Sequence, residues 1–217
     1  MNNFPVEQLR DISNEFIKSG DFESAIFWLE KVKNHLTKVC IASNYIDEDF
    51  YNYIIAMIAA ERHKCALGLL KARDSGHLWI QVLIAKCYSC VQRCNKALDV
   101  LSFLVVQEKD LGGLIETVRK CKEESPFLNP FVFVSDALFH KASLLEYSGH
   151  VNCVFYYGCA LVCNPLKFSV ARRLLEDELI NMSEVKRLFE RIRKFNAITN
   201  QLSTDLLDTV FHFYQSN

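Results

Sequence analysis

The stretch that decides the fold is Gly20–Val32, which reads GDFESAIFWLEKV. It follows apolar residues at Leu9, Ile12 and Phe16, whose spacing is that of one side of a helix. After the Gly-Asp turn, a second apolar pattern contains the small Ala25, which allows two helices to cross closely. The pattern predicts a helical hairpin. One such hairpin cannot bury its apolar side alone, so we expect it to stack on further copies.

The composition agrees with a helical protein. Half of the 217 residues are hydrophobic, and the 7 Gly and 4 Pro are few for a protein rich in tight turns. The formal net charge of -1 gives no basic signature of nucleic-acid binding. The longest apolar runs, 53–60 and 153–163, are shorter than the about 20 residues that span a bilayer, so no membrane contact is expected.

The cysteines and the N-terminal pattern predict an intracellular protein. Charged residues at Asp11, Glu15 and Lys18 interrupt the first apolar pattern, which argues against a signal peptide. Without secretion, the nine cysteines are expected to be reduced, small and buried. We therefore expect the protein in the nucleus and cytoplasm.

The hairpin pattern recurs along the chain. Small alanines at Ala66 and Ala97 repeat the role of Ala25, which predicts three hairpins within residues 1–104. Residues 105–130 contain Gly and Pro breaks and are expected to form a partly mobile insertion, with a short polar helix over 114–124. Residues 131–217 are expected to contain further hairpins and a capping helix, so that the chain forms one continuous α-solenoid.

Three helix starts are predicted in the second half of the chain. Pro165 follows a Tyr156–Asn164 segment and is expected to begin the next helix. Ser183 is expected to cap the following helix, and Ser203 or Thr204 to open the last one.

The segments Gly20–Val32 and Tyr156–Pro165 resemble the tetratricopeptide repeat (TPR) family. The resemblance implies an all-α fold, a right-handed superhelix of helix-turn-helix repeats. No repeat has the family's full Trp-x-x-Leu-Gly-x-x-Tyr start, because the first unit carries Leu9, Ile12 and Phe16 instead.

Two longer passages narrow the resemblance. The order of segments along the chain is similar to that in the N-terminal domain of the Cdc27-type scaffold subunits of the anaphase-promoting complex (cyclosome). The segments are 83–90 (LIAKCYSC) and 96–101 (KALDVL), followed by an insertion and then 160–165 (ALVCNP). The resemblance implies a non-enzymatic scaffold of a ubiquitin ligase that acts in mitosis. It also implies self-association through the N-terminal repeats and contacts with other subunits of the complex. That family captures activator tails with a further C-terminal array, and no tail-binding residue is carried over.

The first helices of the second and third hairpins have a second apolar edge, expected to face the inside of the superhelix. Its members are Tyr51, Ile55, Ile58, Ala59, Trp79 and Val82. Such an edge suits an apolar helix better than a terminal carboxylate. The expected occupant is the N-terminal helix of a second copy, through Phe4, Val6 and Leu9, which predicts a symmetric homodimer. The alternative is that the edge packs against neighbouring helices of its own chain.

Chemistry is not the expected role of this chain. Cys87, Cys90 and Cys94 have a spacing that superficially suggests a metal site, but a structural zinc needs four ligands and no second cluster matches. We expect no catalytic residue, metal, cofactor or small-molecule substrate. A basic stretch at Lys186, Arg187, Arg191, Arg193 and Lys194 is expected to be a solvated helix face, with an acidic partner as the alternative. The competing functions are an adaptor for peptide tails of partner proteins, as in co-chaperones, and an enzyme that uses the cysteines.

Overall fold

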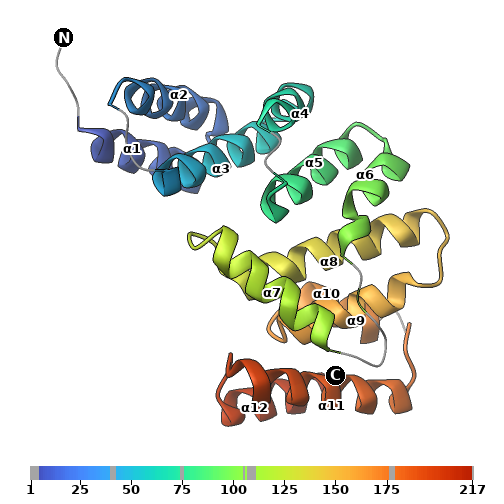
Figure 1. Ribbon diagram of the computed structural model, residues 1–217. Coiled ribbons are helices and arrows are strands. Elements are labelled where there is room, and N and C mark those ends of the chain that lie inside the picture. The colour runs from blue at the N-terminus through green and yellow to red at the C-terminus, as the bar shows by residue number, and fades with distance from the viewer. Residues whose placement is uncertain are drawn as a thin grey trace. The chain divides into compact units, whose positions relative to one another are not determined.

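The computed structural model describes residues 5–39, 43–73, 76–104, 106, 111–175 and 179–216, with the side chains of 37–39, 43–46, 215 and 216 left aside. Within these ranges the chain forms twelve α-helices and a short 3-10 helix, and no strand (Figure 1). The predicted all-α class is therefore confirmed. None of the described helices is long and apolar enough to cross a membrane. The helices group into two compact units, Met1–Arg93 and Cys94–Asn217.

The first unit is a succession of helices in which each packs against the next. In chain order they are α1 (Val6–Ser19), α2 (Phe22–Val39), α3 (Ser43–Ala59), α4 (His63–Ala72) and α5 (Leu78–Cys90). The predicted turn lies at Gly20, whose φ of 79° is a conformation that glycine adopts readily. The next backbone N–H, of Asp21, donates to the carbonyl of Phe16, which ends α1. The carboxylate of Asp21 then accepts from the N–H of Ser24 and begins α2.

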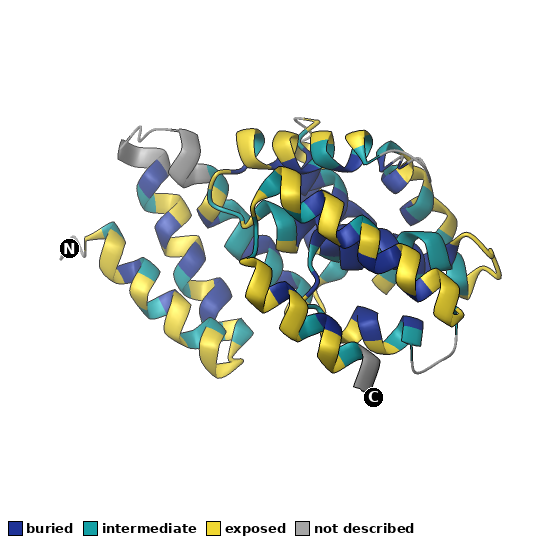
Figure 2. Cartoon of the chain, turned by 90° about the horizontal axis from the view of Figure 1, so that it is seen from below, coloured by how far each residue is buried: buried dark blue, intermediate teal, exposed yellow. Residues whose placement is uncertain are grey.

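The small alanines of this unit are in its core. Ala25 and Ala66 have no exposed surface, as the hairpin pattern predicts. Leu9, Val32 and Leu36 form a buried cluster between α1 and α2. Most helices in Figure 2 accordingly show buried residues on one side and exposed residues on the other.

Side-chain contacts also join alternate helices of the first unit. Arg10 of α1 binds Asp49 of α3 through two nitrogens, with Nε–Oδ1 at 2.9 Å and Nη2–Oδ2 at 2.6 Å. The indole of Trp79 on α5 meets the ring of Tyr51 on α3 edge to face, with ring centroids 5.8 Å apart. The first helices α1, α3 and α5 therefore form one row of neighbours.

The second unit is centred on a tightly packed pair of helices, α8 and α9. In chain order it contains α6 (Cys94–Val100), η1 (Leu101–Phe103), α7 (Gly112–Glu124), α8 (Pro130–Tyr147), α9 (Cys153–Cys163), α10 (Phe168–Leu175), α11 (Met182–Thr199) and α12 (Thr204–Ser216). Helices α6 and α7 pack against α8, whereas α10 and α11 pack against α9. The boundary between the two units falls inside the third predicted hairpin, 78–104.

The expected insertion contributes to the core of the second unit. Helix α7 buries Leu114, Val118 and Cys121 and packs against α8. The helix predicted over 114–124 is therefore present, but it is amphipathic and not merely polar. Residues 105 and 107–110 of the expected mobile insertion lie outside the described residues.

Two predicted helix starts are wrong by a few residues. Helix α10 begins at Phe168, so Pro165 lies in the turn before it. The N-cap of α11 is Asn181 rather than Ser183, because the Asn181 side chain accepts from the N–H of Glu184 while the Glu184 carboxylate accepts from the N–H of Asn181. The last helix begins at Thr204, as predicted, and the Ser203 hydroxyl accepts from the N–H of Leu206.

Candidate interaction surfaces

The predicted apolar edge of the first unit is only partly accessible. Trp79 and Val82 have no exposed surface, which corrects the expectation that they face an open groove. Their helix α5 buries nine of its thirteen residues, so nearly every side of it is covered. These two side chains belong to the core of the folded chain.

The remainder of that edge lies at the surface of α3. Tyr51, Ile55 and Ile58 are half-buried, and Ala59 is exposed. This set of four residues is called the α3 strip below. It is apolar and partly open, so it keeps the character that the sequence predicts.

The predicted docking residues of the N-terminal helix are partly used within their own hairpin. Leu9 is buried in the cluster between α1 and α2, and Val6 packs partly buried against the same cluster. Phe4 lies outside the described residues. In this state, Leu9 is not available to a second copy.

The polar side of α1 offers no ready clamp for a carboxylate. The guanidinium of Arg10 binds Asp49, and its Nη1 also donates to Glu7 at 2.7 Å. Hydrogen bonding to Asp49 is the main cause that raises the pKa of Arg10, with smaller contributions from the charges of Asp49 and Glu7. The carboxylates of Glu7 and Asp49 already bind the guanidinium of Arg10, so a peptide carboxylate would have to displace one of them.

The expectation that the cysteines are buried holds for only part of them. Of the eight with described positions, Cys87, Cys121, Cys153, Cys159 and Cys163 are buried, whereas Cys94 is half-buried and Cys65 and Cys90 are exposed. Burial raises the pKa of Cys87 to about 12, and partial desolvation raises the pKa of the exposed Cys90. Such thiols stay protonated near neutral pH and are weak nucleophiles and metal ligands. Among the residues with described positions, no group of three or more His, Cys, Asp or Glu side chains could hold a metal ion.

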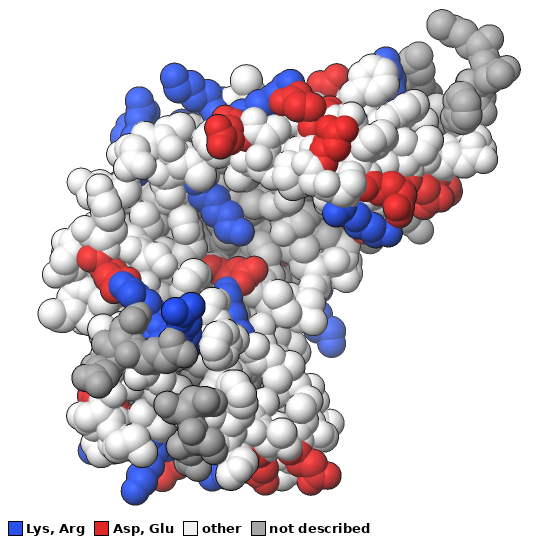
Figure 3. All heavy atoms as spheres, turned by 180° about the vertical axis from the view of Figure 1, so that it is seen from behind, with Lys and Arg blue, Asp and Glu red and all other residues white. Residues whose placement is uncertain are grey.

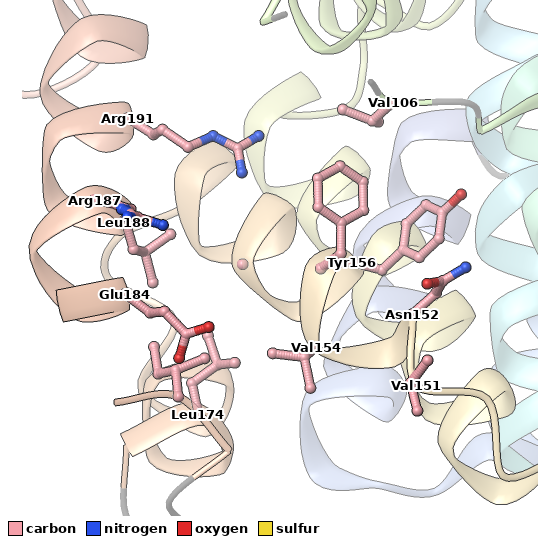
Figure 4. Close-up of a pocket in the computed structure, with 13 residues that line it drawn as sticks. Val106, Val151, Asn152, Val154, Tyr156, Leu174, Glu184, Arg187, Leu188 and Arg191 are labelled. Atoms are coloured by element: carbon pink, nitrogen blue, oxygen red, sulfur yellow. The ribbon is translucent and has the colours of Figure 1, made fainter. Parts of the chain in front are cut away.

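The surface of the second unit contains an open groove of about 680 Å³ between α9 and α11. We call it the α9–α11 groove (Figure 4). Its lining contains Val106, Val151, Asn152, Val154, Phe155, Tyr156, Gly158, Leu174, Ile180, Glu184, Arg187, Leu188 and Arg191. It lies between the second helices of successive hairpins, whereas the sequence pointed to the first helices.

The floor of this groove is apolar and tightly packed. Leu174 and Leu188 are buried, and a Cβ placed on Gly158 would lie 3.7 Å from the Cδ1 atom of Leu188. This is an ordinary van der Waals distance, so α9 and α11 pack closely at this point with room for an alanine. Val151 at the start of the groove is 86% exposed.

The wall formed by α11 carries two arginines. In Figure 4, Arg191 extends from α11 toward α9. Its guanidinium carbon lies 5.5 Å from the centre of the Phe155 ring, and its Nη2 is 3.7 Å from the Cys159 sulfur. Arg187 is exposed one turn earlier. Neither arginine has a carboxylate partner among the described residues.

Behind the groove, a buried lysine holds the end of the 3-10 helix. The ammonium of Lys141 donates to the carbonyls of Leu101 at 3.0 Å and Leu104 at 2.8 Å. It also lies 4.5 Å from the centre of the Tyr156 ring, which lines the groove. Burial lowers the pKa of Lys141 to about 8. Sequence reasoning did not single out this residue.

Charges elsewhere are dispersed. On the face that Figure 3 shows, acidic and basic side chains are interspersed over a mostly uncharged surface. This distribution agrees with the small net charge and gives no extended basic surface on that face.

Comparison with known proteins leaves the function to be argued from these surfaces. No family model matches the chain, and no curated protein matches it.

Proposed function

We propose that this protein is a non-enzymatic scaffold that binds other proteins through the surfaces of its helical hairpins. The observation that carries the proposal is the row of first helices in the first unit. There, Arg10 links α1 to α3, and Trp79 links α3 to α5. Helical rows of this kind present extended surfaces, which repeat proteins use for binding partners.

The finer architecture that we propose is a right-handed superhelix of TPR-like hairpins. Three features support it: a tight turn at Gly20, fully buried alanines where the second helices cross, and successive packing from α1 to α5. The departures from the family's full repeat pattern remain. The proposal of a superhelix therefore rests on the geometry of the hairpins and not on a match to the family's full repeat sequence.

The finest level of the proposal is a scaffold subunit of the anaphase-promoting complex that forms homodimers and acts in the nucleus and cytoplasm. Its support is the sequence resemblance of residues 83–101 and 160–165, together with the partly open α3 strip. The burial of Trp79 and Leu9 reduces the apolar surface available for such a dimer.

The dimer is tested by the mass of the whole chain in solution, measured by light scattering at micromolar concentration. We expect the mass of two chains, and Ile55→Glu is expected to reduce it to one because it places a carboxylate on the half-buried α3 strip. Lys64→Glu, at an exposed position on α4, is the control and should leave the dimer intact. A single-chain mass for the wild type would refute the dimer.

The scaffold role itself is tested separately by co-purification with subunits of the ubiquitin ligase. We expect stable, stoichiometric recovery of at least one such subunit. The adaptor alternative predicts instead that the chain binds peptides that end in a free carboxylate. The engagement of Arg10 by Glu7 and Asp49 gives that alternative no support in the first unit.

A further inference from the structure

The α9–α11 groove has the composition of a binding site whose occupant has both apolar and acidic groups. Its α9 side presents Val151, Val154 and Phe155, of which the first is largely exposed. The accessible lining of the groove is polar and apolar in nearly equal parts. The two arginines of α11 lie opposite this apolar side (Figure 4).

Among the described lining residues, the charged ones are Arg187, Arg191 and Glu184, so this part of the lining carries a net positive charge. The carboxylate of Glu184 accepts the N–H of Asn181 in the cap of α11, which holds it at the start of that helix. Arg187 has no hydrogen-bond or ion-pair partner within the described part of the chain. Arg191 stacks on Phe155, so its guanidinium is held in place toward the groove.

An arginine that is already positioned loses little conformational freedom when it binds a carboxylate, and its planar group can bind two oxygens at once. Apolar surface beside it adds affinity that does not depend on charge. The two kinds of contact lie within a single groove, so one continuous peptide segment can use both.

We propose that the α9–α11 groove binds an acidic, apolar peptide segment of a partner protein. Carboxylates of the segment pair with Arg187 and Arg191, and its apolar side chains cover Val151, Val154 and Phe155. This inference rests on the proposed function in general, that the chain binds proteins, and adds the place and the chemistry of one partner. It assigns the contact to the second helices of the hairpins, away from the α3 strip.

The dimensions of the site suit a short segment. Helix α9 has 11 residues and is about 16 Å long, which is the length of three helical turns. The groove is open and follows the N-terminal half of α9, as far as Gly158, so an occupant is bound at the surface and not enclosed.

The test is a selection of peptides of about 12 residues, three turns of helix, from a random library against the whole wild-type chain. We expect the selected peptides to be enriched in Asp and Glu together with large apolar residues. Fluorescence anisotropy of the selected peptides then gives their dissociation constants with variants of the protein.

The variants separate the groove from the rest of the surface. Arg187→Glu is expected to weaken binding by about tenfold or more, because it replaces attraction with repulsion. Lys186→Glu makes the same change of charge at the neighbouring exposed residue of α11, which does not line the groove, and should change affinity by less than about twofold. Val151→Glu should also weaken binding, and since both groove variants are at exposed positions, neither should affect folding.

The proposal is overturned if no peptide is enriched, if the enriched peptides show no acidic bias, or if Arg187→Glu and Lys186→Glu weaken binding equally. These outcomes concern only the groove. Partner subunits that still co-purify with Arg187→Glu would leave the scaffold role intact while removing the groove from it.

Discussion

The buried Lys141 makes the stability of the second unit depend on pH in a direction that can be calculated. Its ammonium is bound by two carbonyls and faces an aromatic ring, and no carboxylate pairs with it in the described structure. Burial lowers its pKa from 10.5 to about 8. The unfolded chain therefore holds the proton more tightly than the folded chain does.

The sign follows from proton linkage. Below pH 8 both states are protonated, and the folded state bears the full cost of the buried charge. Between pH 8 and 10.5 the folded state releases its proton first, so the free energy of unfolding rises with pH. From pH 7 to pH 9 the rise is about 1 kcal/mol, within a total of about 3 kcal/mol at higher pH.

The perturbation is Lys141→Met, which keeps the length of the side chain and removes the charge. Urea unfolding followed by circular dichroism at pH 7, 8 and 9 gives the free energy of unfolding of both proteins. We expect the free energy of unfolding of the wild type to rise by about 1 kcal/mol relative to that of the variant between pH 7 and pH 9. Buried thiols such as Cys121, whose pKa burial raises to about 12, titrate in both proteins, and their effect cancels in the difference.

Lys186→Met is the matched control, because it makes the same substitution at an exposed position of the same unit. A wild type minus Lys141→Met difference that stays constant, or that falls as pH rises, would refute the account of Lys141 as a desolvated, unpaired ammonium.

Three further predictions concern single contacts, each measured by urea unfolding. Asp49→Ala should destabilise the chain by about 1–3 kcal/mol, because it removes the two-point partner of Arg10; an effect no larger than that of Lys18→Ala, whose ion pair is exposed, would contradict this. Asn181→Ala should cost about 1 kcal/mol by removing the side-chain oxygen that accepts from the N–H groups of Ser183 and Glu184, and Asn181→Asp should restore most of it. Gly158→Ala should be neutral or stabilising by up to about 1 kcal/mol, since the new Cβ meets Leu188 at an ordinary 3.7 Å; a loss above 1 kcal/mol would show that the two helices cannot adjust.

Local sequence signals predicted the hairpins because the causes are local. Gly20 allows the turn, and Ala25 and Ala66 are small where helices cross. The cap of α11 could also have been found, because Asn181 and Glu184 have the spacing of a capping box, which is a stronger signal than Ser183 alone. The prediction of Ser183 as the N-cap was wrong because it gave the single serine more weight than the capping-box pair two residues earlier.

The apolar edge was harder to predict, because exposure depends on what other helices cover. Helix α5 reads LWIQVLIAKCYSC and is apolar on nearly every side, a pattern of a helix surrounded by others. Dividing it into a packing stripe and an exposed edge was therefore unjustified, and Trp79 and Val82 are buried. Helix α3 is apolar around most of its circumference as well, yet Ile55 and Ile58 stay half-buried.

The α9–α11 groove was also hard to predict, because here a helix whose sequence predicts full burial is partly exposed. Helix α9 reads CVFYYGCALVC, which predicts burial on every side, and its C-terminal half from Tyr157 is indeed buried. Its N-terminal half is covered on one side by α11, whose groove-lining residues are Glu184, Arg187, Leu188 and Arg191, only one of them aliphatic. Arginine can cover an apolar surface with its hydrocarbon stem while its charged group stays at the surface. An apolar helix beside a basic one is therefore a pattern from which a groove for an acidic, apolar partner could be predicted, once the two helices are known to be neighbours.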